Sequence, residues 1–385
     1  MGNRKSNENR LRVCRVVDVP LHEVSGICLR RGRNGRMFLI AVGDRMSKIA
    51  WFAEPRSDEG RIDWHMRNIA KLSGSMLPKD DSQIEAVCAD GSGRVLLLQE
   101  TPPRVEFIDP RAVKVVASIE LAVEGRGELA RAWSDPKGSR GEGIALLPGG
   151  HLLIAKEKNP AAFIEFGPPR SRSRGLVRGG ALADGERWPI KKGHHRFVAL
   201  AVWLPDKALA KTCADFSDLE IGPDGYLYLL SDQSSTIARL DDLPAGGGTA
   251  AFLDAWRMGD LDGKPEGLAF TAQGRAIVGL DTRKPRRNLV LLEPEVAQLR
   301  RRGHSGPRGT PTAGGTPATG KAVIRAEVEA MIANIAAFKS ERMAHRVISR
   351  QRSVRSLFDG GAGAAGACSA YRASTGTREQ EIGRR

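Results

Sequence analysis

The stretch RGEGIALLPGGHLLIAKEKNPAAFIEF, residues 140–166, decides the fold. Glu142 precedes a short apolar run, Gly149 and Gly150 supply a turn, and a second apolar run leads to Glu157. Glycine accepts the positive φ angles of tight hairpin turns, and short runs rich in Leu and Ile suit strands better than helices. The stretch therefore predicts a β-hairpin bracketed by two carboxylates and followed by a third strand.

The same pattern recurs at four further places along the chain. These are EVSGICLRRGRNGRMFLIAVGDRMSKIAWF from Glu23, EAVCADGSGRVLLLQETPPRVEFID from Glu85, DLEIGPDGYLYLLSDQSSTIARLD from Asp218, and EGLAFTAQGRAIVGLDTRKPRRNLVLLE from Glu266. A fourth apolar segment follows most repeats, at 63–72, 114–121, 196–204 and 250–258. Repeats built from one small antiparallel sheet each are typical of β-propellers.

The repeats also predict how the ring closes. The fifth repeat has no fourth strand, whereas a spare apolar segment at 11–19 precedes the first repeat. A first strand that completes the last sheet leaves no open edge. We therefore predict an all-β fold, a β-propeller of five four-stranded blades over 10–295, closed by the N-terminal strand. A polar insertion at 167–195 lengthens the third repeat, so a sixth blade stays open as an alternative.

Acidic residues mark both ends of each hairpin. In a propeller the innermost strand begins next to the end of its antiparallel partner, so both acids of every repeat are expected at one mouth of the central channel. Ser25 replaces the first acid in the first repeat. The inner set is Glu85, Glu142, Asp218 and Glu266, and the second set is Asp44, Glu100, Glu157, Asp232 and Asp281.

Nine carboxylates around one opening cannot all stay ionised and unpaired, so protons, cations or hydrogen bonds must compensate them. One interpretation is an acidic cup that holds a hard cation through oxygen ligands, calcium being the best fit. Nearby basic residues such as Lys156 and Arg283 would then bind an anionic group such as phosphate. The structural alternative is that each acid links neighbouring blades by accepting backbone N–H groups.

The phrases EGIALLPGGHLLIAKEKNP, DFSDLEIGPDGYLYLLSDQSSTIARLD, and KPEGLAF followed by GLDTRK resemble the phytase-like (esterase-like activity of phytase) β-propeller family and the related SdiA-regulated propeller family. The resemblance implies a calcium-assisted hydrolase of phosphate or other esters. The residues for such a site come from the acidic cup and are not carried over from the family. Glu142 and Glu157 would serve as general base or ligand, and Lys156 and Arg283 would orient the reacting group. The metal ligands would be Asp44, Glu85, Glu100, Asp218, Asp232, Glu266 and Asp281.

A non-catalytic propeller that binds a small anionic ligand or a protein partner is the alternative function. No G-x-S-x-G or H-E-x-x-H motif is present in the sequence. Five cysteines without a C-x-x-C pair, and an N-terminus without a secretory apolar core, indicate a cytoplasmic protein. We expect it to be a monomer.

The net charge of +15 is concentrated in the C-terminal tail. Residues 296–385 contain 16 Lys or Arg and 6 Asp or Glu, a net charge of +10. We predict a disordered Pro/Gly/Thr-rich linker over 296–320, an amphipathic basic helix over 321–358 and a disordered segment over 359–385. We interpret the basic stripe of this helix as a solvent-exposed face. The alternative is that the stripe contacts nucleic acid, a membrane surface or a partner helix.

Overall fold

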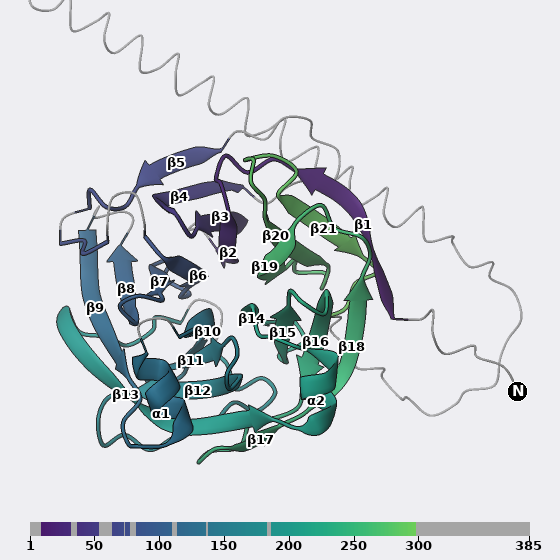
Figure 1. The fold of residues 1–385 in the computed structure, drawn as a ribbon. Helices are drawn as coiled ribbons and strands as arrows, with labels where there is room; N and C mark the ends of the chain where they lie inside the picture. Colours follow the sequence, from purple (N-terminus) through teal and green to yellow (C-terminus); the bar gives the residue numbers. More distant parts are fainter. Residues whose placement is uncertain are drawn as a thin grey trace, which may run out of the picture. The chain divides into compact units, whose positions relative to one another are not determined.

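The computed structural model describes residues 9–31, 37–53, 64–72, 74–77, 82–109, 114–135, 138–182 and 186–297. Strand pairing links the strands into sheets of eight, nine and four strands, with β17 attached to β13. We divide these sheets into five units of four consecutive ladder neighbours and number them as blades 1 to 5. The blades surround a central axis, and their first strands lie innermost (Figure 1). The predicted all-β propeller is therefore confirmed.

The blades have the following strands. Blade 1 contains β2 (Val24–Arg31), β3 (Met37–Gly43), β4 (Met46–Ala53) and β5 (His65–Asn68). Blade 2 contains β6 (Ile84–Ala89), β7 (Val95–Gln99), β8 (Arg104–Asp109) and β9 (Lys114–Ala122). Blade 3 contains β10 (Gly141–Leu147), β11 (His151–Lys156), β12 (Ala162–Gly167) and β13 (Gly193–Pro205). Blade 4 contains β14 (Asp218–Ile221), β15 (Leu227–Ser231), β16 (Thr236–Leu240) and β18 (Phe252–Met258).

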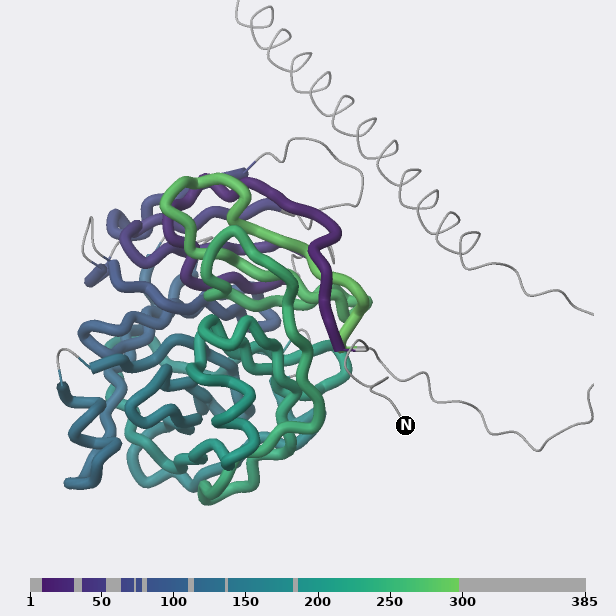
Figure 2. The backbone as a smooth tube through the Cα atoms, turned by 45° about the vertical axis from the view of Figure 1, so that its right-hand side comes forward, coloured from purple at the N-terminus to yellow at the C-terminus, as the bar shows by residue number. Residues whose placement is uncertain are grey.

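Blade 5 is the one that closes the ring. It contains β19 (Lys264–Phe270), β20 (Ala276–Asp281), β21 (Leu289–Glu293) and, as its outermost strand, the N-terminal β1 (Arg10–Val17). β1 pairs antiparallel with β21 and also parallel with β18 of blade 4. Figure 2 shows this purple N-terminal strand lying against the green strands from the end of the described chain. The prediction of closure by the N-terminal strand is therefore correct.

Apolar side chains fill the spaces between neighbouring blades. One buried cluster joins Leu98 and Phe107 of blade 2 to Ile154 of blade 3, and another joins Phe163 of blade 3 to Leu229 of blade 4. Alternating apolar positions on each strand supply these contacts, because successive side chains point to opposite faces of a sheet. Outside the blades lie α1 (Glu128–Ser134), α2 (Lys207–Thr212) and the short strand β17 (Gly248–Ala250), which pairs with β13.

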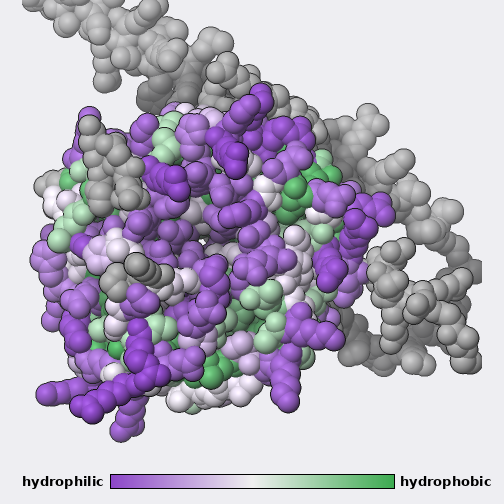
Figure 3. Space-filling model, in the orientation of Figure 1, coloured by the Kyte–Doolittle hydropathy of each residue, from purple (hydrophilic) through white to green (hydrophobic). Residues whose placement is uncertain are grey.

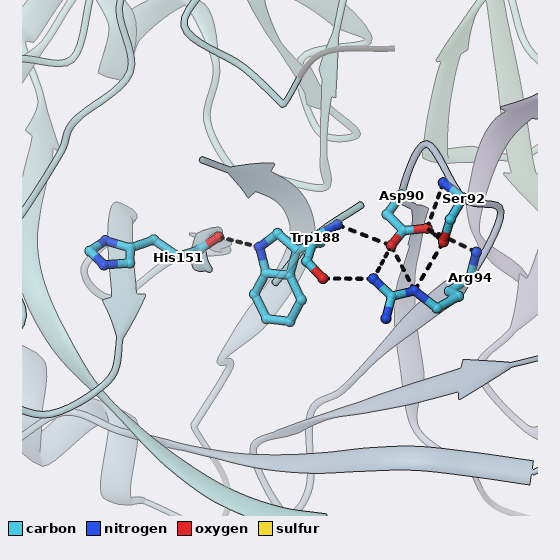
Figure 4. Close-up of polar contacts among 5 residues, drawn as sticks. All are labelled: Asp90, Ser92, Arg94, His151 and Trp188. Carbon is cyan, nitrogen blue, oxygen red and sulfur yellow. Dashed lines mark hydrogen bonds and ion pairs between the residues drawn. The ribbon is translucent and has the colours of Figure 1, made fainter. Parts of the chain in front are cut away.

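The insertion at 167–195 adds no sheet among its described residues. It contributes an isolated bridge from Leu176 to Leu243 before β13 begins at Gly193. It is nevertheless anchored, because Trp188 is fully buried between blades 2 and 3. Its N–H donates to Asp90 at 3.1 Å and its indole N–H donates to the carbonyl of His151 at 3.1 Å (Figure 4).

The described chain extends two residues past the predicted boundary at residue 295. Val296 and Ala297 are buried, and both donate their N–H groups to the carbonyl of Gly274 in blade 5. Most of the predicted linker over 296–320, and all of the segments predicted over 321–358 and 359–385, lie outside the described residues. Within the described part of the chain, no helix combines the length and apolar character needed to cross a membrane.

Candidate functional site

A β-bulge marks the same place in four of the five inner hairpins. The strand register skips one residue at Ser25, Glu85, Glu142 and Glu266. A bulge leaves one residue out of the ladder and re-aims its side chain. The three acids at these bulges are half-buried, whereas Ser25 is buried. Repetition of the bulge places the three carboxylates at equivalent points around one end of the channel.

Blade 4 departs from the predicted alignment of the acids. There Asp218 pairs directly with Leu230, the residue two positions before the second acid Asp232. In the other blades that position pairs with Gly26, Ala86, Gly143 and Gly267. Asp218 is therefore not equivalent to Glu142, and Ser217 takes the place of the inner acid in blade 4.

The position that Asp218 occupies is where neighbouring inner strands come closest. A Cβ atom on Gly143 would lie 2.6 Å from the N atom of Leu219 in the next blade, and one on Gly267 would lie 2.9 Å from the N atom of Ile27. Most of these positions carry glycine or alanine for that reason.

Asp218 uses the same proximity differently. Its carboxylate accepts the N–H of Leu268 in blade 5 at 2.6 Å and the N–H of Leu219 at 2.7 Å, and the residue is 3% exposed. Burial raises the pKa of Asp218, and the two N–H donors oppose that shift. Asp218 therefore links blade 4 to blade 5 by accepting a backbone N–H group, which is the structural role that the sequence analysis gave as the alternative to ligand binding. Ser25 makes a similar link, because its hydroxyl donates to the carbonyl of Ile84 in blade 2 at 2.5 Å.

The other eight predicted acids form one electrostatic group at the channel mouth. Burial raises the pKa of Glu85, and Asp44, Glu100, Glu266 and Glu157 raise it further. Burial also raises the pKa of Glu142, with contributions from Glu85, Glu100, Glu157 and Glu266. These acids come from all blades except the fourth.

Glu266 and Asp232 extend this group to blade 4. Burial, followed by the charge of Asp281, raises the pKa of Glu266 to about 8, and Lys264 partly opposes the shift. Burial also raises the pKa of Asp232, and Asp215 is its strongest acidic neighbour. We call these eight residues the acidic mouth: Asp44, Glu85, Glu100, Glu142, Glu157, Asp232, Glu266 and Asp281. Figure 3 shows mainly hydrophilic residues around the centre of the face that it presents.

Repeated backbone hydrogen bonds hold the second acid of blades 1, 2 and 3. The N–H of Asp44 donates to the carbonyl of Glu23, that of Glu100 to Gln83, and that of Glu157 to Arg140, over 2.9–3.1 Å. Next along the ring, the N–H of Gln83 donates to Asp44 and that of Phe216 to Glu157. These backbone hydrogen bonds fix the main-chain positions of the second acids at the channel mouth.

Few cations balance these charges. Lys156 is 1% exposed and donates its ammonium group to the carbonyl of Lys158. Burial lowers the pKa of Lys156, and the nearby carboxylates of Glu157, Glu100 and Glu142 oppose that shift. Lys158 forms an ion pair with Glu157, which also accepts the hydroxyl of Ser139 at 2.6 Å. Lys156 therefore lies close enough to Glu157, Glu100 and Glu142 for their charges to act on it.

Arg283 lies further out. It is exposed, on the segment between β20 and β21, and forms no ion pair among the residues that the structure describes. Its carbonyl lies 3.4 Å from Nδ1 of His22. In the insertion, His194 is exposed and His195 is half-buried, at the start of the outer strand β13.

Two residues at this end of the molecule were missed by sequence reasoning. Arg140 is 4% exposed, and its guanidinium donates to the carbonyl of Trp133 and to the hydroxyl of Thr101, both at 2.8 Å. It fixes the blade 2 to blade 3 junction beneath Glu100, whose carboxylate accepts the Arg140 N–H at 2.9 Å. Asp215 is 2% exposed and accepts the hydroxyl of Ser231 at 2.5 Å.

Sequence reasoning also missed Glu220, which lies on the inner strand β14. It is half-buried two residues after Asp218, and burial raises its pKa to about 8. Its charge acts on the buried thiols of Cys28 and Cys88, whose pKa values are raised mainly by burial. The equivalent positions in the other blades hold Cys28, Cys88, Ala145 and Ala269, so Glu220 is the acidic member of that row.

The acidic mouth offers carboxylate oxygens that could coordinate a hard cation, but these side chains are not arranged around a common point. Carboxylate oxygens are the ligands that calcium prefers. Within the described part of the chain, however, no group of three or more His, Cys, Asp or Glu side chains is arranged to hold a metal ion. A cation at the acidic mouth would therefore require carboxylate side chains to rotate toward it.

Comparisons with known proteins add little to this description. No family model and no curated protein matches the chain. Among solved structures, the chain is similar to a streptogramin B lyase at 10% identity, with a TM-score of 0.38, 74% of this chain and 97% of the other covered. A glutaminyl cyclase of Myxococcus xanthus and an aldose sugar dehydrogenase of Streptomyces coelicolor each share 11% identity at the same TM-score and coverage. At these scores the propeller assignment rests on the strand pairing itself.

Proposed function

We propose that the acidic mouth is the functional site, that it binds a hard divalent cation, calcium first of all, and that the protein is a phytase-like hydrolase of phosphate or other esters. The observation that supports this proposal most strongly is the group of eight carboxylates, in which burial and neighbouring acidic charges raise the pKa values of Glu85, Glu142 and Glu266. A divalent cation would relieve that repulsion more effectively than the few lysines present.

The proposed roles follow from position and charge. Glu85, Glu142 and Glu266 would hold the cation, which would supply positive charge to the oxygens of the ester. Burial and the neighbouring carboxylates raise the pKa of Glu142, which favours its protonated form, so we assign it the role of general acid or base. Lys156 would orient an anionic oxygen through its ammonium group. We assign Asp218 no ligand-binding role, because its two carboxylate oxygens accept the backbone N–H groups of Leu219 and Leu268.

A non-catalytic binding propeller is the second candidate. It is favoured by the lack, within the described residues, of a group already arranged to hold a metal. Such a protein would use the acidic mouth to bind a cationic ligand or a positively charged segment of a partner. An unaccompanied anion would be repelled by the carboxylates.

The experiment combines calcium binding with turnover. Calcium titration by calorimetry and hydrolysis of p-nitrophenyl phosphate and p-nitrophenyl acetate are measured on the full chain and on Glu142→Gln, Glu157→Gln and Asp281→Asn. Glu124→Gln is the matched control, because Glu124 is exposed next to outer strand β9 and pairs with Arg196. Folding of each variant is checked by circular dichroism.

The outcomes separate the two candidates. Calcium-dependent turnover that falls at least tenfold in the three mouth variants, and not in the control, supports the hydrolase. Calcium binding without turnover on either substrate supports the binding propeller. No calcium binding by the unaltered protein would overturn the cation proposal.

A further inference from the structure

A second cavity lies between blades 1 and 2. It has a volume of about 240 Å³. Protein interiors are packed with few voids larger than a water molecule, so this volume stands out. For comparison, an apolar cavity of about 150 Å³ is large enough to bind benzene. We call it the interblade pocket, lined by Arg30, Phe38, Ile40, Ile49, Trp51, Arg67, Ile69, Leu72, Val95 and Ile108.

The interblade pocket is distinct from the acidic mouth. Inner strands β2 and β6 begin at the acidic mouth, so Arg30 near the end of β2 and Phe38 near the start of β3 lie toward the opposite end. By the same reasoning Val95, at the start of β7, lies away from the acidic mouth. None of the eight acids of the mouth lines the interblade pocket.

The walls of the interblade pocket are apolar and rigid. Ile40, Ile69, Val95 and Ile108 are at most 2% exposed, and each belongs to the buried cluster between the two blades. Trp51 packs beside this cluster and contributes an aromatic surface. Such a surface favours the apolar body of a ligand, because burying apolar groups is the main source of affinity in concave sites.

Two guanidinium groups line the interblade pocket. Arg67 comes from β5, and Arg30 comes from β2. Gly93 helps to place Arg30: a Cβ atom on Gly93 would lie 2.8 Å from Nε of Arg30, so the lack of a side chain there leaves room for the guanidinium. The hairpin that contains Gly93 is itself fixed, because Arg94 donates to the carbonyl of Trp188 at 2.6 Å (Figure 4).

We infer that the interblade pocket binds a small amphipathic carboxylate. The ligand would have one aryl or branched aliphatic body, held by the apolar walls, and one carboxylate, held by Arg30 and Arg67. Arginine is suited to this role because its planar guanidinium matches the two oxygens of a carboxylate. This ligand class is independent of the proposed function, since it uses a surface of opposite charge.

The test compares acids with their neutral amides on the full chain. Phenylacetate, indole-3-acetate and 4-methylpentanoate are titrated by calorimetry, together with phenylacetamide and indole-3-acetamide. We expect the acids to bind about 10- to 100-fold more tightly than the amides, the effect of one charge-assisted hydrogen bond. This comparison needs no variant, so it does not depend on how a substitution affects folding.

Variants then assign the binding to the pocket. Arg67→Met keeps the length and apolar stem of the side chain, and it should weaken the acids about 10- to 100-fold while changing amide affinity less than threefold. Arg12→Met is the matched control, an exposed arginine on β1 of blade 5, and should change neither. Binding should also alter tryptophan emission, and that change should disappear in Trp51→Phe.

Three results would overturn the proposal. One is the lack of measurable binding for all five compounds, which would mean that the interblade pocket is filled by the chain itself. Another is equal affinity for acids and amides. The third is an equal loss of binding in Arg67→Met and Arg12→Met, which would place the binding elsewhere.

Discussion

Asp218 in blade 4 accepts the N–H of Leu268 in blade 5 at 2.6 Å, and this hydrogen bond crosses the boundary between two inner strands. The carboxylate belongs to a row that is otherwise glycine or alanine. An acidic residue in this repeat can therefore connect neighbouring blades instead of binding a ligand. The four predictions that follow separate the residues that hold the ring from those that form the acidic mouth.

Replacing Asp218 with alanine should destabilise the protein without affecting calcium binding. Two buried N–H groups, those of Leu219 and Leu268, would lose their acceptor. Each buried donor left unsatisfied costs about 1–3 kcal/mol, so we expect a loss of about 3 kcal/mol in the free energy of unfolding in urea. Asp218→Asn retains one acceptor oxygen and should lose less. A calcium affinity that falls with Asp218→Ala in still-folded protein would return this residue to the binding site.

Stability should fall as the pH rises toward 8. The pKa of Glu266 is raised from its ordinary value of 4.5 to about 8, so between these values the folded protein holds a proton that the unfolded chain releases. The free energy of unfolding therefore decreases with pH across this range and levels off above it. Thermal unfolding from pH 5 to 9 measures the slope. Glu266→Gln should flatten it and raise the melting temperature at pH 8 by roughly 2–4 °C; an unchanged slope would show that Glu266 is not its source.

Lys156→Met should destabilise the protein more at pH 8 than at pH 5. Because the pKa of Glu142 is raised, its carboxylate is ionised to a greater extent at the higher pH, where it interacts more strongly with the buried ammonium group of Lys156. We expect a loss of about 1–3 kcal/mol at pH 8, measured by urea unfolding. Lys158→Met is the control, because Lys158 is 42% exposed and its ion pair should contribute less than about 1 kcal/mol. Equal losses at both pH values would contradict this account.

Gly143→Ala should weaken the junction between blades 3 and 4. The added Cβ atom would meet the N atom of Leu219 at 2.6 Å and the Cα atom of Asp218 at 2.9 Å, and backbone atoms cannot easily move away. Overpacking of this kind costs about 1–3 kcal/mol. Gly259→Ala has its nearest neighbour at 3.4 Å and should change stability by less than about 0.5 kcal/mol. A neutral Gly143→Ala would show that the inner strands can separate without cost.

The fold could be predicted from the sequence because its signals are local and repeated. Gly150 and Gly225 mark hairpin turns, and the spare segment before the first repeat indicates the closing strand. The positions of the acids were harder. Asp218 was aligned with Glu142 because both are acidic, whereas counting back eight residues from Gly150 and from Gly225 gives Glu142 and Ser217.

Other parts of the site depend on contacts that no local pattern encodes. The burial of Arg140 beneath Glu100 depends on how blades 2 and 3 meet. The interblade pocket needs residues from seven segments of blades 1 and 2, far apart in the chain. The anchoring of the polar insertion by Trp188 was missed for the same reason, since its partners Asp90 and His151 lie in two different blades.

The pairing of β1 with β21 has a consequence for synthesis. The ribosome makes Arg10–Val17 before the other strands of the propeller, yet this strand finds its antiparallel partner only after Leu289–Glu293 has emerged. Through most of translation the newborn chain holds an unpaired apolar segment, and contacts between such distant positions form slowly. A circularly permuted gene that begins at Val19 and places Arg10–Val17 directly after Glu293 would encode blade 5 as one continuous stretch. In that variant, β1 should pair with β21 soon after both strands have been made.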